Sequence, residues 1–119
     1  MSMSLYARNQ LLDLLVTGKT LYIGLHTASP GETNANEVTD SAYARKAATF
    51  TVDTSGGSAA LSAAATWAAT ATAYTVTHVA LYDAATGGNQ IARQALKAAT
   101  AFAVGDTPTF AAGDITLRG

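Results

Sequence analysis

The first pattern along the chain is helical and runs from about Leu5 to Val16. Ser4 precedes this segment as a suitable N-cap, and Gly18 follows it as a suitable stop. Apolar residues recur inside it at helical spacing: Leu11, Leu12 and Leu15. We therefore expect one N-terminal helix over about residues 5–16, whose short apolar stripe covers an open edge or end of the remaining fold.

After the helix, the apolar pattern changes to period two, which is typical of β-strands. Apolar and other residues alternate most regularly over 20–28 and 74–82. Further strand signatures cover 43–52, 90–97, 107–111 and 115–117. The alanine-rich segment 59–73 has no caps and no helical stripe, so we predict it to be extended, with Trp67 as its anchor.

Turn and loop signals separate these strands. Glycine-containing turns are expected at 55–58, 86–89, 104–106 and 112–114, and the polar stretch 29–41 is expected to be a long surface loop. Six to eight short strands after one helix predict a mainly β chain, folded as an antiparallel β-sandwich or small barrel in a single domain over residues 1–119. The expected core consists of the following apolar residues: Leu12, Leu15, Leu25, Trp67, Val79, Leu81, Phe110 and Ile115.

Composition suggests that this core is thin. Apolar residues make up 49% of the chain, but alanine (27 residues) and threonine (18) dominate, and there are only one Trp and three Phe. Small side chains remove little apolar surface from water, so less free energy offsets the chain entropy. Such a domain gains from burial against neighbours, which favours a part of an assembly.

Charge, apolar run length and cysteine content each exclude a class of partner or site. The net charge is −1 and the densest basic cluster is Arg45-Lys46, so we expect no nucleic-acid partner. The longest helix-like apolar stretch, Leu11 to Val16, is far shorter than the ~20 residues of a membrane span, and the first residues do not resemble a signal peptide. With no cysteine, disulfides and thiolate metal sites are excluded.

Residues capable of catalysis are present but not arranged in a known motif. The candidates for a Ser-His-Asp type of site are His26, His78, Asp83, Asp106 and Asp114. No nucleophile elbow or metal-spaced histidine cluster accompanies them, so we expect half-exposed strand histidines that are hydrogen-bonded to neighbours. The acidic loop with Glu32, Glu37 and Asp40 lacks the oxygen spacing of a calcium loop. We therefore expect no enzyme activity, no cofactor and no metal.

The order of the segments carries a family resemblance over nearly the whole chain. These segments are the helix ending LLDLL (11–15), then LYIGLHTASPGE (21–32), YARK (43–46), Trp67, THVALYDAATGGN (77–89) and FAAGDITL (110–117). Together they resemble a group of small virion proteins of tailed bacteriophages, of the head-decoration or tail-fibre-like kind. The resemblance implies a structural role in the virion and no active site.

Two locations follow from the resemblance. The first is the capsid surface, where a homotrimeric decoration (cement) protein, made in the cytoplasm of the bacterial host, would bridge subunits of the major capsid protein. The alternative is a tail or tail-fibre-associated adaptor that contacts a receptor or other tail proteins. A high copy number per virion would indicate decoration, and a handful of copies would indicate the tail. A third possibility, a carbohydrate-binding or hydrolytic sandwich, would need a pair of carboxylates ~5 to 9.5 Å apart in a cleft.

The long loop and the tyrosine after it are the expected partner contacts, because long loops in compact domains are usually functional. The proposed contact residues are Glu32, Thr33, Asn34, Asn36, Glu37 and Tyr43. Their polar character suits a wet interface, whose weak contacts gain strength when many copies engage. Replacing residues 32–37 by a Gly-Ser linker is therefore expected to leave the melting temperature nearly unchanged and to reduce occupancy on particles.

Overall fold

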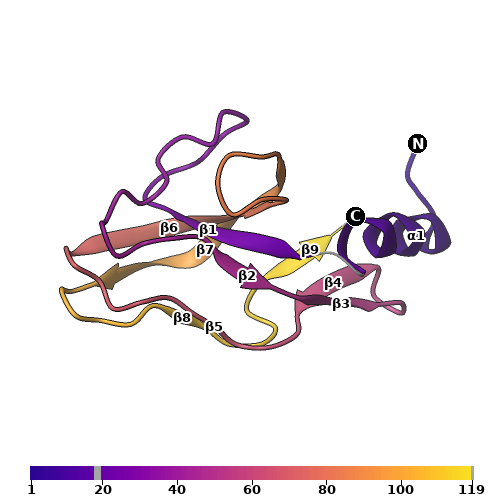
Figure 1. Ribbon diagram of the computed structural model, residues 1–119. Helices are drawn as coiled ribbons and strands as arrows, with labels where there is room; N and C mark the ends of the chain where they lie inside the picture. The colour runs from indigo at the N-terminus through magenta and orange to yellow at the C-terminus, as the bar shows by residue number, and fades with distance from the viewer. Residues whose placement is uncertain (18–19, 119) are drawn as a thin grey trace.

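The computed structural model describes residues 1–17 and 20–118, and within these ranges the chain forms one helix and nine strands (Figure 1). The elements in chain order are α1 (Leu5–Val16), β1 (Leu21–His26), β2 (Lys46–Ala48), β3 (Phe50–Asp53), β4 (Ser58–Leu61), β5 (Ala65–Thr66), β6 (Tyr74–Tyr82), β7 (Gln90–Phe102), β8 (Thr109–Phe110) and β9 (Thr116–Arg118).

The strands form three antiparallel sheets. The largest has the order β2-β1-β6-β7, the second has the order β3-β4-β9, and β5 pairs with β8 alone. This arrangement confirms the predicted mainly β, antiparallel sandwich-like fold with one N-terminal helix. The strand count exceeds six to eight because the segments predicted as single strands are divided: residues 43–52 contribute β2 and β3, and residues 59–73 contribute most of β4 and all of β5. The molecule is elongated, with extents of 45 × 27 × 26 Å.

Helix α1 has the predicted bounds, because local capping and spacing determine them. The Ser4 hydroxyl accepts a hydrogen bond from the Ala7 amide (3.1 Å), and Thr17 ends the helix by donating its amide to the Asp13 carbonyl (2.9 Å). Gly18, the predicted stop, lies outside the described residues. The helix packs against β3 and β4 and so covers one end of the smaller sheet, as expected.

The buried face of α1 differs in part from the predicted stripe. Leu12 and Val16 lie in the core, and Leu15 is partly buried against it. Leu11, which was expected in the stripe, is 40% exposed. Since α1 carries apolar residues around most of its circumference, its periodicity alone could not say which of them face the core.

The core lies between the inner faces of the sheets and includes most of the residues proposed from the sequence. Leu25, Trp67, Val79, Leu81 and Ile115 are at most 4% exposed, and Phe110 is partly buried against them. The Trp67 and Phe110 rings meet edge to face with 5.6 Å between their centroids, which joins β8 to the segment after β5.

Strand β6 has the predicted bounds, but β7 continues five residues beyond the predicted end at Lys97. The β6–β7 register shifts between the pairs Val76↔Thr100 and His78↔Ala95. Four residues of β7, 96–99, therefore lie opposite Thr77 alone, and β7 is locally bulged.

Two turns near the C-terminal end repeat one sequence, Phe-Ala-x-Gly-Asp, at 102–106 and 110–114. In each, the aspartate carboxylate accepts a hydrogen bond from the alanine amide at 2.8 to 2.9 Å. Gly105 and Gly113 have φ values of +88° and +87°, which glycine adopts without strain. The two predicted glycine turns are confirmed.

Candidate partner-contact loops and their buried polar network

Two loops rise from the same side of the four-stranded sheet: residues 27–45, between β1 and β2, and residues 83–89, between β6 and β7 (Figure 1). We call the two together the loop platform. The first loop folds back along β1 through the hydrogen bonds Thr27 amide to Asn36 carbonyl (3.0 Å) and Val38 amide to Leu25 carbonyl (2.9 Å). It therefore covers the outer face of β1, which is why residues of both faces of this strand are buried.

His26 lies beneath the platform and is fully buried. One ring nitrogen, Nδ1, is 2.8 Å from the Ala35 carbonyl oxygen, and the other, Nε2, is 2.8 Å from the Tyr82 hydroxyl. Because a carbonyl oxygen only accepts, we assign the proton to Nδ1, and the Tyr82 hydroxyl then donates to Nε2. Burial lowers the pKa of His26 and thereby favours this neutral form.

Glu37 joins distant parts of the first loop to each other and, through Tyr43, to β1. Its carboxylate receives two charged hydrogen bonds from Arg45, Nε to Oε2 at 2.9 Å and Nη2 to Oε1 at 3.0 Å. The Tyr43 hydroxyl donates to the same carboxylate at 2.5 Å and accepts from the Leu25 amide at 3.0 Å. Burial alone would raise the pKa of Glu37, but the hydrogen bonds from Arg45 and Tyr43 outweigh burial and leave the pKa lowered.

Arg45 also fastens the second loop. Its guanidinium carbon lies 3.5 Å from the centroid of the Tyr82 ring, a cation–π contact, and its Nη1 donates to the carbonyls of Ala84 (3.1 Å) and Gly87 (2.7 Å). Only 8% of its side chain is exposed. One arginine thus links the Glu37 carboxylate, the Tyr82 ring and the 83–89 turn, so the two loops form one connected structure.

Gly24 makes room for this network. A Cβ atom at this position would lie 2.8 Å from the Tyr82 ring, 3.1 Å from the Glu37 carboxylate and 3.3 Å from the Tyr43 hydroxyl. Any side chain here would displace at least one of the three groups.

Asp40 anchors the far end of the first loop. Its carboxylate accepts hydrogen bonds from the Thr72 amide (2.7 Å), the Thr72 hydroxyl (2.6 Å), the Ala71 amide (3.1 Å) and the Ala42 amide (3.2 Å). These bonds lower the pKa of Asp40, since they favour the charged carboxylate.

The outer part of the platform is a polar rim near the start of β7. Gln90 donates to the Gly31 carbonyl (2.9 Å) and to the Asn34 side chain (2.8 Å), and Arg93 pairs with Glu32 at 2.9 Å. Asn34 and Asn36 have positive φ values, +61° and +64°, which asparagine tolerates better than most residues.

The structure divides the proposed contact residues into two groups. Glu32, Thr33 and Asn36 are exposed and Asn34 is partly exposed, so their side chains are accessible on the rim. Glu37 and Tyr43 point inward and use their polar atoms within the network, so the contacts proposed below are limited to the rim residues. Sequence periodicity could not show this, because the inward direction of both side chains depends on how the loop folds back over β1.

The histidine prediction is also only partly correct. His78 is half-exposed and its ring lies 2.8 Å from the Thr77 hydroxyl, as expected of a strand histidine. His26 is fully buried instead, because the long loop covers its face of the sheet. The roles of Arg45 and Tyr82 were not predicted. The only sequence signal for them was the presence of a charged and an aromatic residue next to the two loops.

The arrangement binds the two loops of the platform to each other and to β1. Across residues 1–17 and 20–118, no group of three or more His, Cys, Asp or Glu side chains could hold a metal ion. Within the same described ranges, no helix is both long and apolar enough to span a membrane.

Comparison with protein-family models matches residues 2–118 to the family described as podophage GP4 fiber I protein gp80. A search of the curated proteins finds no match. The matched range includes α1, all strands described above and the complete loop platform.

Proposed function

We propose, from the premise that this chain belongs to the podophage GP4 fiber I protein gp80 family, that it is a structural component of the phage tail-fibre apparatus. The family makes the chain a phage virion protein. It supports a fibre role more than capsid decoration, which was the first expectation from the sequence. The observation that carries the proposal is the length of the match, since the family pattern includes the helix, the sheets and the platform together.

The proposed mode of action is contact without catalysis. The titratable groups under the platform are paired with one another: Glu37 with Arg45, and His26 with Tyr82. Groups paired in this way hold a loop in one conformation, whereas a general acid or base must be accessible to a substrate. We expect the purified chain to show no hydrolase activity and to bind no divalent metal tightly.

The platform is the proposed contact surface for a neighbouring virion protein or a receptor. Its accessible polar side chains include Glu32, Thr33, Asn36, Thr86 and Asn89. Because the network beneath holds both loops, little conformational entropy is lost when they bind. Polar rim contacts of this kind are individually weak, and a fibre that displays several copies would gain strength from multivalency.

The proposed oligomer is a homotrimer assembled through α1. Among the described residues, six of the seven large apolar side chains that are exposed belong to the first 14 residues: Met1, Met3, Leu5, Tyr6, Leu11 and Leu14. Ala7, Leu11 and Leu14 have the i, i+4, i+7 spacing of a helix–helix seam. Copies of α1 packed along this seam would remove the exposed leucines from water.

Cryo-electron microscopy of intact virions, with a small tag inserted at Gly105 as a marker, tests the location. Gly105 lies in an exposed turn, and a Cβ there would meet nothing within 4 Å. Tag density confined to the tail supports the proposal. Density spread over the capsid would overturn it in favour of the decoration role.

A further inference from the structure

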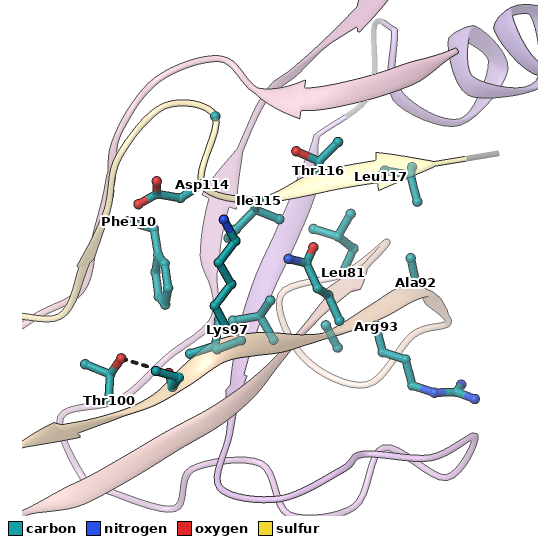
Figure 2. A pocket seen from close by; sticks show the side chains of 16 residues that line it. Leu81, Ala92, Arg93, Lys97, Thr100, Phe110, Asp114, Ile115, Thr116 and Leu117 are labelled. Atoms are coloured by element: carbon teal, nitrogen blue, oxygen red, sulfur yellow. Dashed lines mark hydrogen bonds between the residues drawn. The ribbon is translucent and has the colours of Figure 1, made fainter. Parts of the chain in front are cut away.

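An open groove of about 790 Å³ lies between β7 and the segment that leads into β9, on the side of the four-stranded sheet away from its β2 edge (Figure 2). Its apolar lining includes Leu81, Leu96, Phe110, Ile115 and Leu117. In Figure 2 the Phe110 ring and the Lys97 side chain both extend into the space between the two walls. Residues 27–45 and 83–89 of the loop platform do not line the groove, which adjoins the platform rim at Arg93.

Two sheet edges border this groove. Strand β7 is the last strand of the four-stranded sheet and β9 is the last strand of the three-stranded sheet, so in the described chain each has a strand neighbour on one side only. With 13 residues, β7 is the longest strand described here. An unpaired edge presents a row of amide and carbonyl groups, to which an extended peptide can add by main-chain hydrogen bonds.

Charge on β7 disfavours a second copy of the same strand as the occupant. A two-fold antiparallel pairing of β7 edges centred on Ala95 would place Arg93 of one copy opposite Lys97 of the other. Like charges directly opposite one another destabilise a strand pair. The bulge over residues 96–99 further restricts regular self-pairing.

The charged side chains of the lining, Arg93 and Lys97 against one carboxylate, Asp114, are net positive and favour an acidic occupant. Arg93 already pairs with Glu32, but none of the ion pairs among the described side chains includes Lys97, which is exposed and extends over the groove. A carboxylate on an entering strand would complement it. The apolar lining would receive alternate side chains of that strand, since these point to one face.

We propose that this groove binds an extended segment of another protein, which adds to the free edge of β7, places alternate apolar side chains between β7 and the 110–117 segment, and carries a carboxylate that meets Lys97. This binding site is additional to the platform contacts and does not depend on where the chain is located in the virion.

Selection of a random decapeptide library against the purified full chain tests the proposal. We expect enriched peptides in which apolar residues alternate with polar ones and at least one position is acidic. Binding of a selected peptide is then measured by calorimetry for two groove variants, each compared with a matched control. Ala98→Trp fills the groove and Lys97→Glu reverses its charge, and each should weaken binding about tenfold or more, equivalent to about 1.4 kcal/mol.

The matched controls lie at exposed positions that do not line the groove. Ala101→Trp adds the same ring on the same strand, and Lys46→Glu makes the same charge reversal on β2, at the opposite edge of the sheet. Both should bind like the wild type. Melting curves check that all four variants fold, and if Ala98→Trp does not fold, the comparison of Lys97→Glu with Lys46→Glu decides.

Three results would overturn the proposal. Selected peptides without alternation or acidic residues, or with equal affinity for the groove variants and their controls, would exclude strand addition. Displacement of the peptide by a hyaluronate hexasaccharide, accompanied by direct binding of that sugar, would reassign the groove to acidic glycans. Self-association that Ala98→Trp abolishes and Ala101→Trp preserves would assign it to a second copy.

Discussion

At the scale of single residues, the platform depends on polar side chains that satisfy one another away from water. Arg45 and Glu37 are 8% and 24% exposed, so removing one charge leaves the other with little access to solvent. In the pair of Arg93 and Glu32, whose side chains are 41% and 85% exposed, water can solvate either charge when its partner is removed. Two ion pairs with the same 2.9 Å distance should therefore contribute very differently to stability.

Glu37→Gln is expected to lower the free energy of unfolding by about 2 to 3 kcal/mol, because it leaves the Arg45 charge largely buried and without its partner. Glu32→Gln, the matched control on the rim, should change it by no more than about 0.5 kcal/mol. Urea denaturation of the two variants and the wild type measures both effects. Equal losses would mean that the Glu37 pair is as well solvated as the Glu32 pair.

His26 should make the fold sensitive to mild acid. Its pKa in the folded chain is lowered from the ordinary value of 6.5, mainly by burial, so below about pH 6.5 the unfolded chain binds the proton more readily. The contribution of neutral His26 to the free energy of unfolding is therefore fully present above about pH 6.5. It is lost as the pH falls from there toward the folded-state pKa. Glu37, whose pKa is lowered from 4.5, adds a second loss below that pH as it is protonated.

Urea denaturation between pH 8 and 5 checks the histidine effect. His26→Gln should lose the decline that begins near pH 6.5, whereas His78→Gln should keep it, because the buried His26 is still present. A decline of the same size in the His26 variant would assign the acid sensitivity to another group.

At the scale of elements, α1 has two apolar faces with different roles. Leu12 is 1% exposed and packs into the core over β3 and β4, whereas Leu14 is 65% exposed. The first face connects the helix to its own sheet. The second is available to another helix.

Leu12→Ala should lower the free energy of unfolding by about 2 to 5 kcal/mol, the usual range for a buried leucine. Leu14→Ser should leave the unfolding of dilute protein within about 0.5 kcal/mol of the wild type. In sedimentation equilibrium at higher concentration, Leu14→Ser should instead shift the proposed trimer toward the monomer. A monomeric wild type at every concentration would contradict assembly through α1.

At the scale of the whole molecule, the sheets separate the surfaces with proposed roles. In Figure 1, α1 lies at one end of the elongated molecule, and the platform loops rise from the four-stranded sheet away from it. The groove between β7 and β9 provides a third surface. A subunit built in this way can contact several neighbours at once, as the proposed fibre role requires.

The platform can be tested without disturbing the network below it. Replacing residues 32–37 with a linker would also remove Glu37, so the change should be limited to the exposed side chains, as Glu32→Ser with Thr33→Gly. We expect the melting temperature to stay near that of the wild type and the occupancy on virions, measured by quantitative immunoblotting, to fall. The control Thr51→Gly, at an exposed position on β3, should keep normal occupancy. Unchanged occupancy of the rim variant would place the essential contact elsewhere.

The sequence by itself determined the features that depend on neighbouring residues. Capping and spacing set the bounds of α1, strict alternation set those of β6, and glycine marked the turns at 105 and 113. The tertiary structure decided which polar residues are buried: His26 bonds Tyr82 across 56 positions, and Glu37 points inward because the loop folds over β1. The groove likewise forms only because the fold places β7, an edge of the four-stranded sheet, opposite the segment leading into β9, an edge of the three-stranded sheet. Periodicity reports which face of a helix or strand a residue occupies, but burial depends on what the rest of the chain places against that face.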